Sequence, residues 1–259
     1  MNDQNRGAWL AFLAVLVAAS FALVWWIQQS PPSKFAVDSD GVWRPRISTN
    51  FDTAEPADAR SDRRFDPPQV DRAGSWEWMN TQPGSDEPVT YDPCVPIHVE
   101  INPRTGPAHG IELVVAAIER TQDATGLEFV VDSATVEEPT FGETANTTEA
   151  SVLIGWSDPD TLPELEGNVA GLGGSAIGVH EGRHFYMSGE IALDGPDLRD
   201  ASDAEIIALT MHELGHVVGL GHTDAFGELM NAENSGQLDW GPGDRYALAT
   251  LGSGPCIDR

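Results

Sequence analysis

The feature that most constrains the fold is the segment 212–222, which reads HELGHVVGLGH. His212 and His216 lie four residues apart, so on a helix both side chains project from the same face. Gly219 can adopt the left-handed conformation that ends a helix, where a Cβ would be penalised. The turn at Gly219 brings His222 back towards the other two histidines. The segment therefore requires a helix that ends in a sharp turn beside a third histidine.

Three histidines in this arrangement predict a metal site. Imidazole nitrogens suit Zn²⁺, and three protein ligands leave one position for water or substrate, as in catalytic zinc sites. Glu213 adjoins the first ligand, and we expect it to be the general base rather than a ligand. The alternatives are a helix that carries incidental surface histidines and a zinc site without activity.

Hydrophobic patterning outside this segment predicts an α+β domain with one mixed sheet. Strands are expected at 97–101, 127–132, 151–156 and 184–194, with a strand-like piece at 76–78 and a glycine-rich stretch at 167–178. Helices are expected from Pro107 to Gly126, from the capping box Ser202–Glu205 to Gly219, and over a short segment that begins at Pro242.

The N-terminal part of the chain has a different character. Residues 1–7 form a short tail, and residues 8–29 carry no charge and are long enough to cross about 30 Å of hydrocarbon. We therefore expect a single-pass anchor in the lipid bilayer, with secretion after cleavage of a signal peptide as the alternative. Residues 30–73 are rich in Pro, Asp and Arg and predict a linker. Residues 74–259 are then the folded domain.

The net charge excludes two classes of partner. The 259 residues include 41 acidic and 14 basic ones, for a formal charge of −27, and residues 91–259 hold 29 of the acidic and 6 of the basic residues. Such a chain cannot present a basic face to nucleic acid or to anionic lipid. The charge favours solubility of an exported monomer, and it should attract cationic peptides less strongly at high salt.

Cys94 and Cys256 are the only cysteines, and they lie near the two ends of the patterned region. In an exported domain such a pair predicts a disulfide that joins the ends of the fold. A free buried thiol and a metal-binding thiolate are the alternatives. A disulfide would also favour a location of the domain outside the cytoplasm.

The site resembles the metzincin metalloproteases and, among them, the matrixins, because Thr223 follows the third histidine and Leu229-Met230 follows a short loop. The resemblance covers about residues 90–259. It implies a twisted five-strand sheet, two long helices, and zinc-dependent cleavage of extracytoplasmic proteins, with Glu213 as the catalytic base. It further implies that Met230 forms an apolar floor beneath the histidines. A peptide substrate would bind along an edge strand within 169–179 or 184–194.

The chain departs from the matrixin pattern at Asn231, where the family commonly has a larger residue and a proline. The segment 92–96 faintly resembles a cysteine switch, in which the Cys94 thiolate would occupy the open zinc position. His180 and His184 are candidate ligands of a second, structural zinc. Candidate calcium ligands follow from loop carboxylates at Asp158, Asp160, Asp194 and Asp197.

Two other functions stay open at this point. One is a non-catalytic surface module that keeps zinc for folding. The other is a zinc hydrolase that acts on a non-peptide amide of the cell envelope.

Overall fold

The computed structural model describes residues 35–37, 43–45, 63–141, 151–233 and 236–257. Its main sheet has the strand order β1-β2-β5-β4-β6-β8-β7. Five strands form most of it: β4 (Ile97–Asn102), β5 (Phe129–Ala134), β6 (Ser151–Ser157), β7 (Gly171–His180) and β8 (Arg183–Asp194). β4 runs parallel to β5 and β6, and β6 runs parallel to β8, whereas β7 is antiparallel to β8. The predicted α+β class with a mixed sheet is therefore confirmed.

The glycine-rich stretch is the edge strand of this sheet. β7 comes last in the strand order, so one of its edges has no neighbouring strand in the described sheet. At the other end of the order, the three-residue strands β1 (Phe35–Val37) and β2 (Trp43–Pro45) extend the sheet beyond β5. These two strands lie within the segment that the sequence predicts as a linker.

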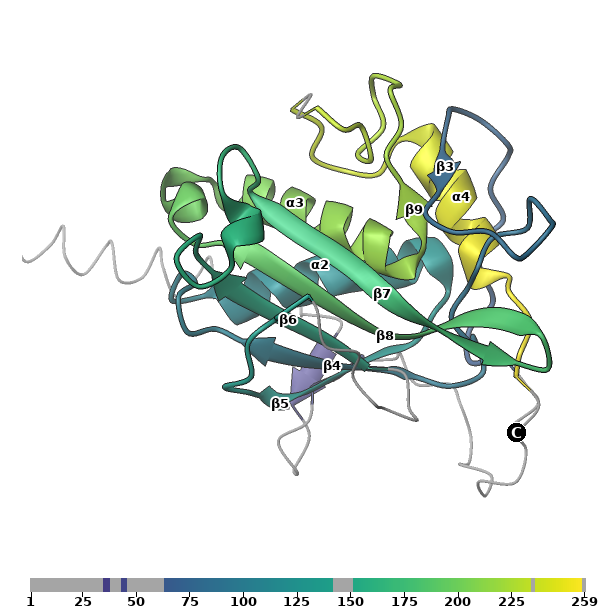
Figure 1. Ribbon diagram of the computed structural model, residues 1–259, viewed down its shortest axis with the longest axis horizontal. Coiled ribbons are helices and arrows are strands. Elements are labelled where there is room, and N and C mark those ends of the chain that lie inside the picture. Colours follow the sequence, from purple (N-terminus) through teal and green to yellow (C-terminus); the bar gives the residue numbers. More distant parts are fainter. Residues whose placement is uncertain (1–34, 38–42, 46–62, 142–150, 234–235, 258–259) are drawn as a thin grey trace, which may run out of the picture. The chain divides into compact units, whose positions relative to one another are not determined.

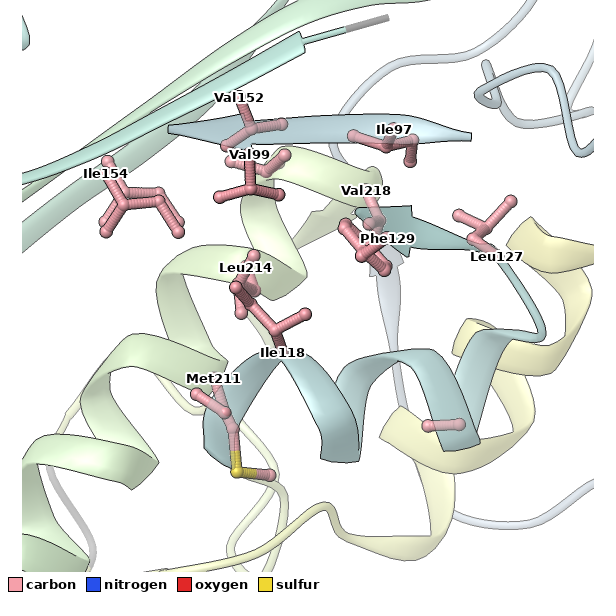
Figure 2. Packing of buried hydrophobic residues seen from close by; sticks show 14 of the residues in the cluster. Ile97, Val99, Ile118, Leu127, Phe129, Val152, Ile154, Met211, Leu214 and Val218 are labelled. Atoms are coloured by element: carbon pink, nitrogen blue, oxygen red, sulfur yellow. The ribbon is translucent and has the colours of Figure 1, made fainter. Parts of the chain in front are cut away.

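Two long helices, α2 (Gly110–Thr125) and α3 (Asp203–Val218), lie on one side of the sheet (Figure 1). Val99 and Ile154 point from the sheet towards Ile118 of α2 and Leu214 of α3, as Figure 2 shows, and all four side chains are fully buried. Burial of each such side chain contributes about 1.5–3 kcal/mol. The third helix, α4 (Pro242–Gly252), packs against α2 and α3.

The ends of α3 follow the signals in the sequence. Ser202 Oγ accepts a hydrogen bond from the Glu205 N–H, and the Glu205 carboxylate accepts one from the Ser202 N–H, which is the predicted capping box. At the other end Gly219 has φ 121°, and its N–H donates to the Gly215 carbonyl. This conformation excludes most side chains and turns the chain away from the helix axis.

A two-stranded sheet fixes the chain immediately after this turn. β9 (Leu220–Gly221) pairs antiparallel with β3 (Glu77–Trp78), which is the strand-like piece expected at 76–78. In addition, the Met79 N–H donates to the Gly219 carbonyl over 2.8 Å. A segment about 140 residues upstream therefore determines where the chain goes after α3.

Residues 63–76, which we call the strap, lie along the folded domain, although the sequence predicts a linker up to residue 73. The Arg63 guanidinium donates to the carbonyls of Gly252 and Gly254, just past the end of α4. Carbonyl groups at a helix end lack partners within the helix, so they are natural acceptors for an arginine. Polar contacts hold the start of the strap, and at its end Trp76 packs against the core with its ring centroid 4.7 Å from that of Tyr246.

Cys94 and Cys256 form a disulfide with their Cα atoms 5.4 Å apart, which confirms the predicted pair. The alternatives of a free thiol, a metal-binding thiolate and a cysteine switch at Cys94 do not apply to this oxidised state. Within the described ranges we find no helix that is long and apolar enough to cross a membrane. The predicted tail and anchor, residues 1–7 and 8–29, lie outside the described residues.

Candidate metal centre

The three histidines of the motif come together at the end of α3. His212 and His216 lie one helical turn apart, and His222 follows β9 directly. Their ring centroids are 4.5–5.1 Å apart, and each residue offers a ligand atom within 4.8 Å of the others. His216 is buried, whereas His222 is exposed to solvent. The group could therefore hold a metal ion that a solvent molecule or a substrate can still reach.

Backbone carbonyls orient two of the three rings. His212 Nδ1 lies 2.8 Å from the Leu229 carbonyl oxygen, and His216 Nδ1 lies 2.8 Å from that of Leu220. A carbonyl oxygen only accepts, so Nδ1 of each ring must carry the hydrogen, and Nε2 is left with a free lone pair. Partners of this kind fix the tautomer and direction of histidine ligands in metal sites.

The Nε2 atoms of the three rings meet at one point. His222 Nε2 lies 3.0 Å from His212 Nε2 and 3.0 Å from His216 Nε2. A single hydrogen on His222 Nε2 can satisfy only one of these neighbours, so at least one pair of lone pairs is left face to face. A cation between the rings removes that repulsion, and the residues present therefore fit a metal ion.

Burial makes these rings hard to protonate. It lowers the pKa of His212 to about 4 and, together with the neighbouring His212 ring, that of His216 to about 3. Burial also lowers the pKa of His222. Neutral imidazoles are the form that binds metal.

Glu213 lies beside this group, between α3 and the edge strand β7. Its side chain is 4% exposed, and no described residue donates a hydrogen bond to its carboxylate. Burial raises its pKa to about 8 in the metal-free molecule. A divalent cation at the histidines would favour the charged carboxylate instead. Glu213 does not belong to the group of ligand atoms formed by the histidines.

Met230 lies at the end of the loop that follows His222, and its side chain packs against α3. It is fully buried, and a Cβ added at Gly215 would lie 2.5 Å from its Sδ atom. Gly215 lies between His212 and His216 in the sequence, so the methionine contacts the helix where it carries two of the histidines. The Thr223 N–H donates to the Met230 carbonyl and closes the loop between them.

Two buried carboxylates that sequence reasoning missed, Glu228 and Asp244, hold this loop on α4. Asp244 accepts hydrogen bonds from the N–H groups of Leu229 and Met230. Glu228 accepts from the N–H groups of Gly243 and Asp244 at the start of α4. Because the Leu229 carbonyl orients His212, these carboxylates help to place a candidate metal ligand. The sequence signal for Asp244 was its position two residues after Pro242, because acidic residues favour the first turn of a helix.

The other predicted sites are not gathered in the same way. In the described parts of the chain, neither the four calcium candidates nor His180 and His184 form a group of three with ligand atoms within 4.8 Å. Asp194 is buried, its carboxylate accepts a hydrogen bond from the Asp197 N–H, and burial raises its pKa. His180 and His184 lie on either side of the β7–β8 turn. Both sites stay predictions.

Comparison with known proteins finds no protein-family model that matches this chain and no curated protein with significant similarity to it. What the site does must therefore be inferred from its own residues.

The low pKa values of the histidines predict a pH dependence of the metal-free protein. In the unfolded chain a histidine has a pKa of about 6.5. Just below that pH, the histidines of the unfolded chain become protonated, whereas His212 and His216 of the folded chain stay neutral. Each of these histidines should therefore lower the free energy of unfolding by about 2 kcal/mol between pH 7 and pH 5. The raised pKa of Glu213 acts in the opposite direction over the same range, because the folded chain holds a proton that the unfolded carboxylate has released, so the histidine contribution is read as the difference between a histidine variant and the parent chain. Urea unfolding of the two chelator-treated proteins at both pH values measures this difference.

The matched variant is His216→Gln, which removes one of the two titrating rings. Its loss between pH 7 and pH 5 should be about 2 kcal/mol smaller than that of the parent chain. Equal losses in both proteins would show that His216 is not held neutral by the fold.

Proposed function

We propose that this chain is a zinc endopeptidase of the matrixin-like metzincin type. It would hydrolyse extracytoplasmic proteins, and residues 8–29 would anchor it in the membrane as a single-pass protein. The observation that carries the proposal is the convergence of three imidazoles, two of them oriented by backbone carbonyls, beside a buried carboxylate with no hydrogen-bond partner among the described residues.

Zinc is the proposed metal because the three ligands are imidazole nitrogens. Hard cations such as Ca²⁺ and Mg²⁺ prefer oxygen ligands. A structural zinc site usually has four protein ligands and is closed, whereas this group has three histidines and the third is exposed. The open position favours catalysis over a purely structural role.

Bound zinc would polarise the scissile carbonyl group and make the attacking water more acidic. Glu213 would accept a proton from that water and then donate it to the nitrogen of the leaving amine. Its carboxylate is suited to this task because no hydrogen bond from the described residues engages it. His212 and His216 keep their Nδ1 hydrogens on backbone carbonyls and stay fixed throughout.

The open edge of β7 supports a peptide as the substrate. The Asp194 N–H donates to the Ala170 carbonyl, so 170 and 194 are a hydrogen-bonded pair of the antiparallel ladder. Hydrogen-bonded and non-hydrogen-bonded pairs alternate along such a ladder. Gly171, Gly173 and Ser175 are therefore in non-hydrogen-bonded pairs, and their backbone N–H and C=O groups point away from β8. An extended peptide could add to this edge by backbone hydrogen bonds. A Cβ at Gly171 would lie 2.8 Å from Glu213 Oε1, so this edge passes the proposed catalytic base.

The disulfide supports the proposed location of the domain outside the cytoplasm, because such bonds persist in oxidising compartments. The net charge of −27 adds a bias in the substrate. Cationic segments of proteins should be drawn to the domain, and the attraction should weaken as salt is added.

The test is peptide-library cleavage by the full-length chain in detergent, with zinc content measured in the same sample. We expect cleavage products in the zinc-loaded protein, none after chelation, and recovery when zinc is restored. Mass spectrometry of the products gives the preferred residues around the scissile bond, and cationic residues should be enriched there at low salt.

Two results would contradict the proposal. A chain with one zinc per molecule that cuts no peptide at any pH would instead support the non-catalytic surface module. Hydrolysis of a non-peptide envelope amide by the same sample, without peptide cleavage, would support the zinc hydrolase.

A further inference from the structure

Two glycines of the edge strand lie against the residue proposed as the catalytic base. A Cβ built on Gly171 would lie 2.8 Å from Oε1 and 3.1 Å from Cγ of Glu213. A Cβ built on Gly173 would lie 2.5 Å from the Glu213 backbone oxygen. Real Cβ atoms do not approach other heavy atoms this closely, so a larger residue at 173 would push β7 away from the α3 backbone, whereas a larger residue at 171 would displace the Glu213 side chain.

The backbone conformation does not explain these glycines. Neither Gly171 nor Gly173 has a positive φ, in contrast to Gly167 and Gly219. Both are extended strand residues, a conformation that any residue adopts, and glycine weakens a strand in which it is not needed. What these glycines provide is the missing Cβ on the side of the strand that faces α3.

Gly174, the next residue in the strand, shows that the close approach belongs to one face of β7. A Cβ built on Gly174 would have no heavy atom within 4 Å. Successive residues of a strand point to opposite faces, so 171 and 173 face α3 and 174 faces away. The strand therefore contains its own internal control for the effect of an added methyl group.

The direction of the Glu213 carboxylate depends on this contact because no polar group in the described part of the chain fixes it. No described residue donates a hydrogen bond to it, and the side chain is almost fully buried. Its rotation is limited by packing, and on the β7 side its Oε1 occupies the space where a side chain at 171 would begin. The same residue turns its own N–H and C=O towards the open edge of the sheet.

We propose that Gly171 and Gly173 are positioning residues for Glu213. Gly173 would let the edge strand lie directly on the backbone of α3 at Glu213, and Gly171 would leave the space that the carboxylate occupies. The proton acceptor and the backbone groups that bind the peptide would thereby be held at a fixed distance from each other. The catalytic part of this inference rests on the proposed function, whereas the packing part does not.

The variant Gly171→Ala tests the inference, with Gly174→Ala as the matched control. The added methyl group at 171 meets the end of a flexible side chain, so we expect the fold to persist and the carboxylate to move. In the zinc-loaded full chain kcat should fall on the order of 10- to 100-fold, with KM and bound zinc unchanged. Gly174→Ala should keep the kcat, the KM and the zinc content of the parent chain.

A rescue variant separates displacement of the carboxylate from general damage. Glu213→Asp shortens the side chain by one methylene group, which withdraws the carboxylate oxygen that lies nearest to position 171. Alone it should lower kcat, because the base is withdrawn from the substrate. In the double variant with Gly171→Ala, the fold decrease in kcat should be smaller than the product of the two single decreases. Multiplicative losses would overturn the positioning role.

A stability cycle tests the contact without reference to activity. In the metal-free chain, Gly171→Ala should lower the melting temperature by several degrees when Glu213 is present. It should have no such effect in the Glu213→Ala background, where the side chain that it meets is gone. Absence of this coupling would overturn the inference even if the parent chain cuts peptides. Coupling in a zinc-loaded chain that cuts no peptide would contradict the proposed function while the packing role of Gly171 stands.

Loss of zinc from Gly171→Ala, or an equal loss of kcat in Gly174→Ala, would also overturn the inference. The first result would mean that the methyl group disturbs the histidines, and the second that any side chain on the strand is harmful.

Discussion

Replacing Glu213 by alanine should abolish peptide hydrolysis and leave zinc bound to the chain. General-base catalysis by a positioned carboxylate contributes on the order of 10²- to 10⁴-fold, so we expect kcat/KM to fall by about that factor. Zinc should stay because the ligand atoms come from His212, His216 and His222, and the Glu213 carboxylate is not among them. The measurement pairs metal analysis with the rate of cleavage of a peptide identified by the library.

Glu213→Gln is the companion variant, because it keeps the size of the side chain but cannot accept the proton in the same way. It should lose as much activity as Glu213→Ala, while the packing against Gly171 is kept. His212→Ala is the opposite control, which should lose both zinc and activity. A zinc-loaded Glu213→Ala chain with the activity of the parent would exclude Glu213 as the base.

Removing the disulfide should cause the largest loss of stability among the substitutions considered for this chain. Cys94 and Cys256 are 162 residues apart in the sequence. In the chain-entropy model, a cross-link that closes a loop of this length destabilises the unfolded state by about 5 kcal/mol. Total stabilities of single domains are about 5–15 kcal/mol, so the doubly substituted chain with Ser at both positions should be close to unfolding. Urea unfolding of the oxidised parent and of this variant measures the difference.

Arg63→Ala in the oxidised chain is the informative control. Arg63 binds the Gly252 and Gly254 carbonyls, close to Cys256, so it holds the same end of the folded domain. Its contacts exist only in the folded state, whereas the cross-link acts mainly on the unfolded chain. The losses of unfolding free energy from Arg63→Ala and from removal of the disulfide should therefore be nearly additive when the two changes are combined. A disulfide-free chain with the same unfolding midpoint as the oxidised parent would contradict the prediction.

The parts of the fold that were predictable are those with a local signal. The capping box at Ser202 and Glu205, the spacing of His212 and His216, and the turn at Gly219 define α3 and its end within 20 residues of sequence. The alternating segments gave β4, β5, β6 and β8 with ends shifted by at most a few residues. The paired cysteines predicted the disulfide from their position alone.

The remaining features depend on contacts between distant segments. The position of His222 follows from the pairing of β9 with β3, which joins residues far apart in the chain. β7 contains too many glycines to show a strand period, because glycine has no side chain to alternate. The strap has prolines and charges but no regular apolar spacing, and it is held at its ends by Arg63 and by Trp76, so its sequence resembles that of a linker. Glu228 and Asp244 accept hydrogen bonds from backbone N–H groups about 15 residues away, and the sequence around each carboxylate does not indicate these partners.

The open edge of β7 has a second consequence, which concerns other copies of the same chain. An unpaired strand edge is a template on which a second copy can add its own edge, and this is a common route to aggregation. The glycines at 171, 173 and 174 provide no bulky or charged side chain to block such an approach. A formal net charge of −27 on each chain would make two copies repel each other and so oppose such pairing. The negative charge of the chain would thus limit its self-association at low salt, and it would do so less effectively at high salt, where the repulsion is screened.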